Sequence, residues 1–244
     1  MEATITVYCK NTHSYHEVPR GISLIELKDL LGIQLPYPII AAHVNYKVEN
    51  LDFRLYKPKD IEFLDASTPS GMRVYVRTLN MVLACAVNEL YPRTDLRVEH
   101  PISKGYYCTL QWHVDKDAEP EEEKEPPVLT KEMIAAIKQR MLQIIAEDRP
   151  IYEEEKQTKE VIKLFASRYN TETSIFEALG NPYCRYFRMG DYIDYYTNVL
   201  LPSSGYITLF DIVPYQDGLL MRIPNRQNPT VLEDEVSQDK MFSI

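Results

Sequence analysis

The side chains that could bind a metal ion or act as nucleophiles are few in this sequence, and their spacing forms no recognisable site. Four cysteines are present, none in a C-x-x-C pair: Cys9, Cys85, Cys108 and Cys184. Because they also suggest no disulfide framework, we interpret them as reduced, mostly buried thiols. Five histidines are present, none with two Cys or His partners at the spacing of a zinc site: His13, His16, His43, His100 and His113.

The sequence motifs of two other kinds of catalytic site are also absent. No G-x-x-x-x-G-K-[ST] sequence is present to hold nucleotide phosphates, and the whole chain has only eight glycines. No G-x-S-x-G sequence is present to place a nucleophilic serine on a sharp turn. The acidic runs at 115–125 and 153–155 are more typical of a solvated surface than of a metal site. The residues alone therefore predict no independent catalytic centre.

The composition is that of an ordinary folded protein. The chain has 244 residues, of which 45% are hydrophobic and 26% charged, and this length allows two domains. No apolar run approaches the roughly 20 residues of a membrane helix, and the N-terminus has no signal-peptide pattern, so we expect a cytoplasmic protein and no membrane partner. The net charge of −9 disfavours broad binding to nucleic acids.

The first 67 residues have the pattern of a small unit of strands around one helix. ATITVYC and SYHEVP alternate like paired strands, and Ser23 and Glu26 form a capping box that starts a short helix. Two or three further strands follow within HVNYKVENLDFRLYKPKDIEFLD. This order and this segment resemble the TGS domain. The resemblance implies a ubiquitin-like β-grasp fold for residues 1–67.

Residues 72–225 have the pattern of a second, mixed unit. Helical periodicity over 78–90 is followed by a strand hairpin, and two more helices are expected at 131–147 and about 158–168. The last strands are expected at YFRMGDYID, YITLFDIVPYQ and GLLMRIP. Within this unit, residues 115–128 are acidic and rich in proline, which predicts a flexible loop. Residues 226–244 are interpreted as a tail or linker.

Two stretches of the second unit carry a family resemblance. RTLNMVLACAVNELYPRTDLRVEHPISKGYYCTLQW at 77–112 and TKEMIAAIKQRMLQIIAEDRPIYEEEKQTKEVIKLFASR at 130–168 resemble the editing-type domain of threonyl- and alanyl-tRNA synthetases. The resemblance implies an α+β fold over 72–225. In that family a His-x-x-x-His pair on the first helix and a Cys-x-x-x-His pair after a Tyr-x-Asp strand bind zinc. The corresponding positions in this chain are Arg77, Met81, Tyr196 and Leu200.

None of these four residues is a credible zinc ligand, so the sequence predicts neither a metal site nor zinc-dependent deacylation of tRNA. Arginine cannot give up its proton, thioether sulfur is a poor zinc ligand, and leucine has no donor atom. Arg77 could instead supply a fixed positive charge that faces Asp194 or an anionic ligand. The alternative is an ordinary solvated arginine at a helix start.

A candidate cleft follows from the same resemblance. The segment 183–206 is rich in tyrosine and arginine, which suits either a base-stacking pocket or ordinary half-buried strand positions. If the synthetase layout holds, the hairpin residues would lie across the same cleft. The candidate binding residues are then Arg77, Met81, His100, Tyr106, Tyr107, Asp194, Tyr196 and Leu200.

A second resemblance concerns the whole chain. HPISKGYYC at 100–108 and VSQDKMFSI at 236–244 resemble bacterial uridine (nucleoside) kinases of the Bacteroidetes type. These kinases carry a TGS domain and an editing-like domain before a P-loop domain. The resemblance implies a non-catalytic region that binds a nucleotide or nucleoside. It also implies a downstream kinase domain as partner, which would use ATP or GTP with Mg²⁺. Two alternatives remain: a tRNA-editing hydrolase, or a TGS-based nucleotide-sensing or interaction module.

Overall fold

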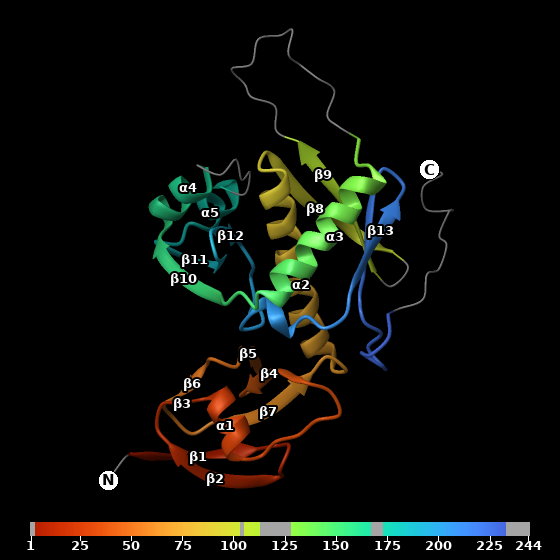
Figure 1. Ribbon diagram of the computed structural model, residues 1–244. Coiled ribbons are helices and arrows are strands. Elements are labelled where there is room, and N and C mark those ends of the chain that lie inside the picture. Colours follow the sequence, from red (N-terminus) through yellow and green to blue (C-terminus); the bar gives the residue numbers. More distant parts are fainter. Residues whose placement is uncertain (1–2, 103–104, 113–127, 167–172, 233–244) are drawn as a thin grey trace.

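A long helix joins a small sheet at one end of the molecule to a larger assembly of strands and helices (Figure 1). In this computed structural model the described residues are 3–102, 105–112, 128–166 and 173–232. Helices and strands are mixed along the chain and most strand pairs are antiparallel. The predicted α+β class is therefore confirmed.

The first sheet has five strands in the order β2-β1-β7-β4-β5. They are β1 (Thr4–Cys9), β2 (Ser14–Pro19), β4 (Ile39–Val44), β5 (Lys47–Glu49) and β7 (Asp60–Asp65). Strand β1 is antiparallel to β2 and parallel to β7, which places a parallel pair inside the sheet. A separate two-stranded ladder joins β3 (Ile22–Ser23) to β6 (Arg54–Leu55).

Helix α1 (Leu24–Leu30) covers this first sheet. The predicted capping box is present, because the Glu26 amide donates to Ser23 Oγ at 3.3 Å and the Ser23 amide donates to Glu26 Oε2 at 2.8 Å. The two buried leucines of the helix, Leu24 and Leu27, belong to one hydrophobic cluster with residues of β1 and β7. Burial of this apolar face, more than helix propensity, holds so short a helix in place.

The long helix α2 (Pro69–Leu90) begins nine residues before the predicted start at Thr78. Thr68 is its N-cap and accepts a hydrogen bond from the Gly71 amide at 3.1 Å, while Pro69 suits the first helical turn. A Cβ on Gly71 would lie 2.0 Å from the Asp65 carbonyl oxygen. This glycine therefore lets the helix start directly against the end of β7.

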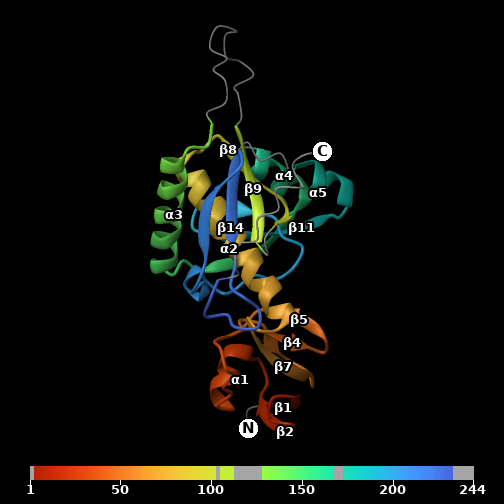
Figure 2. The ribbon, with the colours of Figure 1, turned by 90° about the vertical axis from the view of Figure 1, so that its right-hand side faces the viewer.

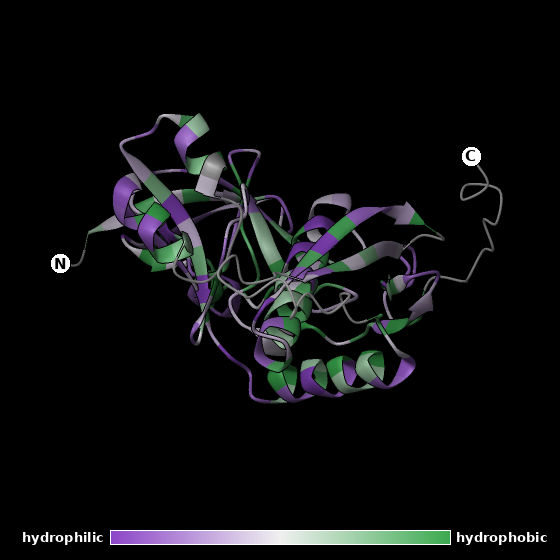
Figure 3. Ribbon diagram, turned by 90° about the horizontal axis from the view of Figure 1, so that it is seen from above, coloured by the Kyte–Doolittle hydropathy of each residue, from purple (hydrophilic) through white to green (hydrophobic). Residues whose placement is uncertain are grey.

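A four-stranded antiparallel sheet packs on α2 in the order β13-β14-β9-β8. Its strands are β8 (Thr94–Ile102), β9 (Gly105–Trp112), β13 (Asp211–Tyr215) and β14 (Gly218–Arg222). Helix α3 (Lys131–Ala146) lies beside α2, and both helices cover the same face of this sheet (Figure 2). Hydrophobic and hydrophilic residues alternate along the helices (Figure 3), and α3 buries Ile134, Ile137, Met141 and Ile144 at helical spacing, as expected for a helix with one buried face.

The remaining strands form a three-stranded antiparallel sheet in the order β10-β11-β12. They are β10 (Ile151–Gln157), β11 (Tyr183–Met189) and β12 (Tyr192–Asp194), and α4 (Thr158–Ala166) and α5 (Thr173–Leu179) pack on them. A short 3-10 helix, η2 (Ser204–Tyr206), follows. The prediction of one strand over 186–194 was wrong, because Gly190 adopts a φ of 60° and turns the chain between β11 and β12.

Several expectations concern residues that the structure does not describe. Of the predicted loop 115–128, only Val128 is described, and of the predicted tail 226–244, only residues 226–232 are described. The unit boundaries 1–67 and 72–225 stay predictions. All four cysteines are described, unpaired and buried, which confirms the interpretation made from their spacing.

Candidate functional site

The positions that would correspond to zinc ligands lie where α2 meets the segment after β12, and apolar packing fills that place. Met81 on α2 is 0% exposed and Leu200 is 1% exposed, and both belong to one hydrophobic cluster. Arg77, one turn earlier on the helix, donates a hydrogen bond from Nη1 to the carbonyl oxygen of Val199. Its partial burial, with Arg73 nearby, lowers the pKa of the guanidinium from its ordinary value.

Thr78 ties the same segment to the helix. This residue is 0% exposed, and its hydroxyl donates to the Val74 carbonyl at 3.0 Å and accepts from the Leu201 amide at 2.9 Å. The sequence analysis did not single it out, because a threonine inside a helical pattern carries no distinctive signal. The second of these hydrogen bonds satisfies the buried Leu201 amide, which lies outside any strand, so Thr78 fixes the chain after β12 against α2.

Asp194, at the end of β12, is partly buried among tyrosines. Its carboxylate accepts hydrogen bonds from the Tyr195 amide at 2.7 Å, the Tyr196 hydroxyl at 2.9 Å and the Tyr192 hydroxyl at 3.1 Å. Burial raises the pKa of Asp194 to about 6, although these three neutral donors act in the opposite direction. Arg77 donates to Val199, and the three donors to Asp194 all come from residues within two positions of it in the chain.

The hairpin residues of the candidate set divide between two faces of the four-stranded sheet. Tyr106 packs on the cluster that contains Met81, whereas Tyr107 belongs to a separate small cluster with Leu220. The Tyr107 ring lies 5.5 Å from the His100 ring, centroid to centroid, and its hydroxyl donates to Asp217. Because neighbouring strand residues point to opposite faces, Tyr106 faces α2 while His100 and Tyr107 stand together on the other face.

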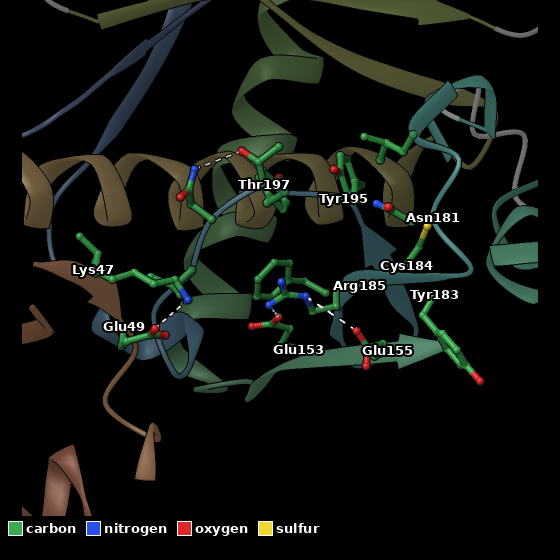
Figure 4. Close-up of a pocket in the computed structure, with 16 residues that line it drawn as sticks. Lys47, Glu49, Glu153, Glu155, Asn181, Tyr183, Cys184, Arg185, Tyr195 and Thr197 are labelled. Carbon is green, nitrogen blue, oxygen red and sulfur yellow. Dashed lines mark hydrogen bonds and ion pairs between the residues drawn. The ribbon is translucent and has the colours of Figure 1, made fainter. Parts of the chain in front are cut away.

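A cavity of about 280 Å³ opens beside the segment that follows β12 (Figure 4). Its walls come from β5 of the first sheet, from β10 and β11, and from residues 195–199. Among the described lining residues, Tyr196 is the member of the candidate set. The main polar lining residues are Lys47, Glu49, Glu153, Glu155, Asn181, Tyr183, Arg185, Tyr195, Tyr196, Thr197 and Asn198.

The charged groups of this cavity are arranged in pairs. Arg185 lies 2.8 Å from Glu153 and 4.0 Å from Glu155, and Lys47 lies 2.8 Å from Glu49. The Arg185 side chain keeps 64% of its surface exposed, so it remains available to a ligand. Its hydrogen bond to Glu153, more than any other effect, raises the pKa of the guanidinium. The cavity therefore offers cationic, anionic, amide and aromatic groups within one opening.

Only part of this cavity lining was predicted from the sequence. The Tyr- and Arg-rich segment was singled out, but the acidic run 153–155 was interpreted as solvated surface. Strand pairing explains the difference, since β10 and β11 place Glu155 opposite Arg185. Lys47 and Glu49 carry no motif at all, and only the three-dimensional arrangement brings β5 to this place.

Among the described residues, no group of three or more His, Cys, Asp or Glu side chains is arranged so that it could hold a metal ion. In the same part of the chain, no helix combines the length and apolar character needed to cross a membrane.

Comparison with curated proteins identifies threonine–tRNA ligases as relatives. No protein-family model matches the chain. It is 28% identical over 195 residues to a threonine–tRNA ligase of Syntrophomonas wolfei, covering 79% of this chain and 28% of the relative. Similar values hold for the threonine–tRNA ligases of Clostridium kluyveri (27% over 192 residues; 78% and 28%) and Symbiobacterium thermophilum (26% over 202 residues; 82% and 29%). The chain spans less than a third of these relatives.

These relatives overturn the assignment to a uridine or nucleoside kinase. The curated proteins found are threonine–tRNA ligases, and the similarity extends over about 80% of the chain. The kinase resemblance depended on two short motifs, and the motif at 236–244 lies outside the described residues. The expected ATP, GTP, Mg²⁺ and downstream kinase domain came from that resemblance alone. The resemblance to threonyl-tRNA synthetases is the part that holds.

Proposed function

We propose that this chain is a unit of the threonyl-tRNA synthetase editing type that binds the aminoacylated 3′ end of a tRNA without metal-dependent hydrolysis. The similarity to threonine–tRNA ligases over 78–82% of the chain supports the tRNA part of this proposal. The observation that carries it is the cavity of about 280 Å³ beside Tyr196, one of the two positions that the family resemblance assigns to the second ligand pair. The other position, Leu200, is buried in the neighbouring hydrophobic cluster.

The cavity has suitable chemistry for the end of an aminoacylated tRNA. Its volume of about 280 Å³ is close to the lower limit of small-ligand sites, roughly 300 Å³. The rings of Tyr183, Tyr195 and Tyr196 can stack against the terminal base, as aromatic side chains do in single-strand binding. Glu153 and Glu155 can accept hydrogen bonds from the ammonium group of the attached amino acid, and Arg185 can hold a phosphate or carbonyl oxygen.

The absence of metal-dependent hydrolysis follows from packing rather than from one substitution. Met81 and Leu200 are both buried in one hydrophobic cluster, and the Arg77 guanidinium donates a hydrogen bond to the carbonyl oxygen of Val199. A zinc ion at this place would need both the space of these apolar side chains and ligand atoms that they lack. The chemistry that remains is hydrogen bonding, stacking and ion pairing, which supports recognition.

The negative charge of the chain limits the size of the proposed contact. A protein that follows the tRNA backbone neutralises many phosphates with Lys and Arg, whereas this chain has a net charge of −9. We therefore expect contact with the terminal nucleotides only. The affinity should then depend weakly on salt compared with proteins that make many phosphate contacts.

The first sheet supports a division into two cooperating units. Its strand order, with α1 on one side and a parallel pair inside, is compatible with a β-grasp domain over 1–67. The editing-type unit would then occupy 72–225. Because β5 supplies Lys47 and Glu49 to the cavity, the proposed site needs both units.

The proposal is tested by measuring binding and hydrolysis in the same samples. Threonyl-tRNA, seryl-tRNA and uncharged tRNA are titrated against the chain by fluorescence anisotropy, and released amino acid is followed with and without added zinc. Tighter binding of a charged tRNA with no release supports the proposal. Release of the amino acid would make the chain an editing hydrolase, and equal weak binding of all three tRNAs would remove the tRNA function.

A further inference from the structure

A second cavity, of about 310 Å³, lies near the start of α2 and shares no described lining residue with the first. It lies between the first sheet, helix α2 and the chain that follows β14. Aromatic and proline rings dominate its walls, and none of the described lining residues carries a charge. The described lining residues are Tyr37, Pro38, Ile40, Ala66, Tyr75, Tyr206, Thr208, Leu209, Pro224, Pro229 and Thr230.

One wall of this cavity is held rigid by Tyr75. Its ring is 2% exposed, and its hydroxyl accepts hydrogen bonds from the amides of Thr208 at 3.0 Å and Leu209 at 2.8 Å. The same hydroxyl donates to the Leu209 carbonyl at 2.9 Å. Tyr206, on the same wall, packs against the cores on both sides of the junction. The wall therefore exists before any ligand binds.

The opposite wall is a short turn that places two buried prolines at the cavity. The Asn225 side chain accepts from the amides of Gln227 at 2.8 Å and Asn228 at 3.1 Å. The Asn225 amide donates to the Val231 carbonyl at 2.8 Å and closes the turn. Pro224 and Pro229 are buried within it. These hydrogen bonds hold the turn in one conformation before a ligand binds, so binding loses little conformational entropy at the turn.

Carboxylates surround the Tyr206 side of the cavity. The Gly205 amide, next to Tyr206, donates to Asp148 Oδ1 at 3.0 Å. Burial raises the pKa of the Tyr206 hydroxyl, and the carboxylates of Asp52, Asp148 and Asp29 add to this effect. Asp29 is paired with Lys28 at 3.1 Å, so Asp148 and Asp52 supply the negative charge on this side of the apolar cavity, which would attract a basic group.

We propose that this cavity binds a proline-rich segment of another protein, with a basic residue next to the prolines. A polyproline II segment has no internal hydrogen bonds, so its carbonyl groups need donors, and its apolar rings need an aromatic surface. The hydroxyls of Tyr206 and Thr208 supply the donors, and the rings of Tyr37 and Tyr206 supply the surface. The nearby carboxylates supply the counter-charge for the basic residue.

The lining argues against the other classes of ligand. A nucleotide or an acidic lipid needs cationic groups at its phosphate, and the described lining has none. An acidic segment would be repelled by the carboxylates near Tyr206. This inference does not depend on the proposed tRNA function, because it concerns a different cavity.

The test uses the full chain and two synthetic peptides that differ in one property. The first peptide is rich in proline and ends in arginine, and the second replaces that arginine by glutamate. Binding is measured by isothermal titration calorimetry and located by amide chemical-shift changes. We expect the basic peptide to bind and to shift signals from Tyr206, Thr208 and Thr230. The acidic peptide should bind roughly tenfold more weakly or not at all.

Matched variants separate the cavity from the rest of the surface. Tyr37→Ala should weaken the basic peptide roughly tenfold, whereas Tyr15→Ala, which removes a ring that is 75% exposed elsewhere, should have no effect. Asp52→Asn should weaken binding about two- to fivefold at low salt, and Asp60→Asn should not. Circular dichroism checks that each variant is folded. Absence of binding, equal binding of both peptides, insensitivity to Tyr37→Ala, or self-association through this face would overturn the proposal.

Discussion

The hydroxyl of Thr78 accepts a hydrogen bond from the amide of Leu201 at 2.9 Å, inside a region where both residues are almost fully buried. This bond joins α2 to the chain that follows β12, across 123 residues of sequence. It lies one residue from Arg77 and one residue from Leu200, two of the positions that the family resemblance assigns to zinc ligands. In this chain the junction is closed by apolar packing and hydrogen bonds.

The first prediction concerns the stability of this junction. Thr78→Val keeps the shape of the side chain but leaves the buried Leu201 amide without its acceptor. We expect the free energy of unfolding to fall by about 1–3 kcal/mol. Thr78→Ser keeps the hydroxyl and should lose less, since only a methyl group is removed. Urea denaturation measures both, and equal losses for the two variants would show that the hydrogen bond contributes little.

The second prediction concerns metal content. We expect the purified chain to contain no stoichiometric zinc, because the four family positions carry no ligand groups. The variant that combines Arg77→His, Met81→His, Tyr196→Cys and Leu200→His should gain zinc if the correspondence with the family is right. Elemental mass spectrometry measures the zinc, and Arg77→His alone serves as the control. Stoichiometric zinc in the unmodified chain would contradict the description of the junction.

Local sequence signals predicted local structure well. The capping box at Ser23 and Glu26 is present, and the helix expected at 131–147 spans Lys131–Ala146, with Thr130 accepting from the Met133 amide at 3.2 Å. Each of these signals acts within a few residues, so no tertiary contact is needed to form it. The start of α2 was missed although Thr68 and Pro69 are typical of a helix N-terminus, because Gly71 lowers the helical tendency of the segment and its close approach to Asp65 cannot be deduced from the pattern.

The cavities could not be predicted from local patterns. Lys47 reaches the first cavity because β5 is the edge strand of the first sheet, and Arg185 reaches it because β11 pairs with β10. Neither fact follows from the residues near each position. The kinase assignment failed for a related reason, because two short motifs were given more weight than similarity over most of the chain.

The third prediction concerns the buried carboxyl of Asp194. Burial raises its pKa to about 6 from an ordinary value of 3.8, so the folded chain holds this proton more tightly than the unfolded chain. The contribution of Asp194 to stability should therefore be greatest in acid and fall as the pH rises from about 4 through about 6. The size of the effect is about 1–3 kcal/mol. The groups that face the carboxyl are the Tyr192 and Tyr196 hydroxyls, the Tyr195 amide and, further away, Asp95.

This pH dependence is isolated by comparison with Asp194→Asn, which has no titrating proton at the same place. Other carboxyls, such as Glu62 and Glu89, have a lowered pKa and change stability in the opposite direction, so the total curve is not informative. The difference between the two proteins in urea denaturation should grow in favour of the variant between about pH 4 and 7. A difference that stays constant over this range would mean that Asp194 does not titrate as described.

The fourth prediction concerns Arg185 in the first cavity. Arg185→Gln removes the guanidinium that is 64% exposed and held by Glu153 at 2.8 Å, while the side chain remains polar. If the cavity holds the end of an aminoacylated tRNA, the dissociation constant for charged tRNA should rise roughly three- to tenfold. Arg97→Gln removes one charge from an exposed position on β8 and controls for net charge. Because both variants change the net charge equally, a larger effect at Arg185 locates the ligand at the cavity, and equal effects would indicate only long-range attraction.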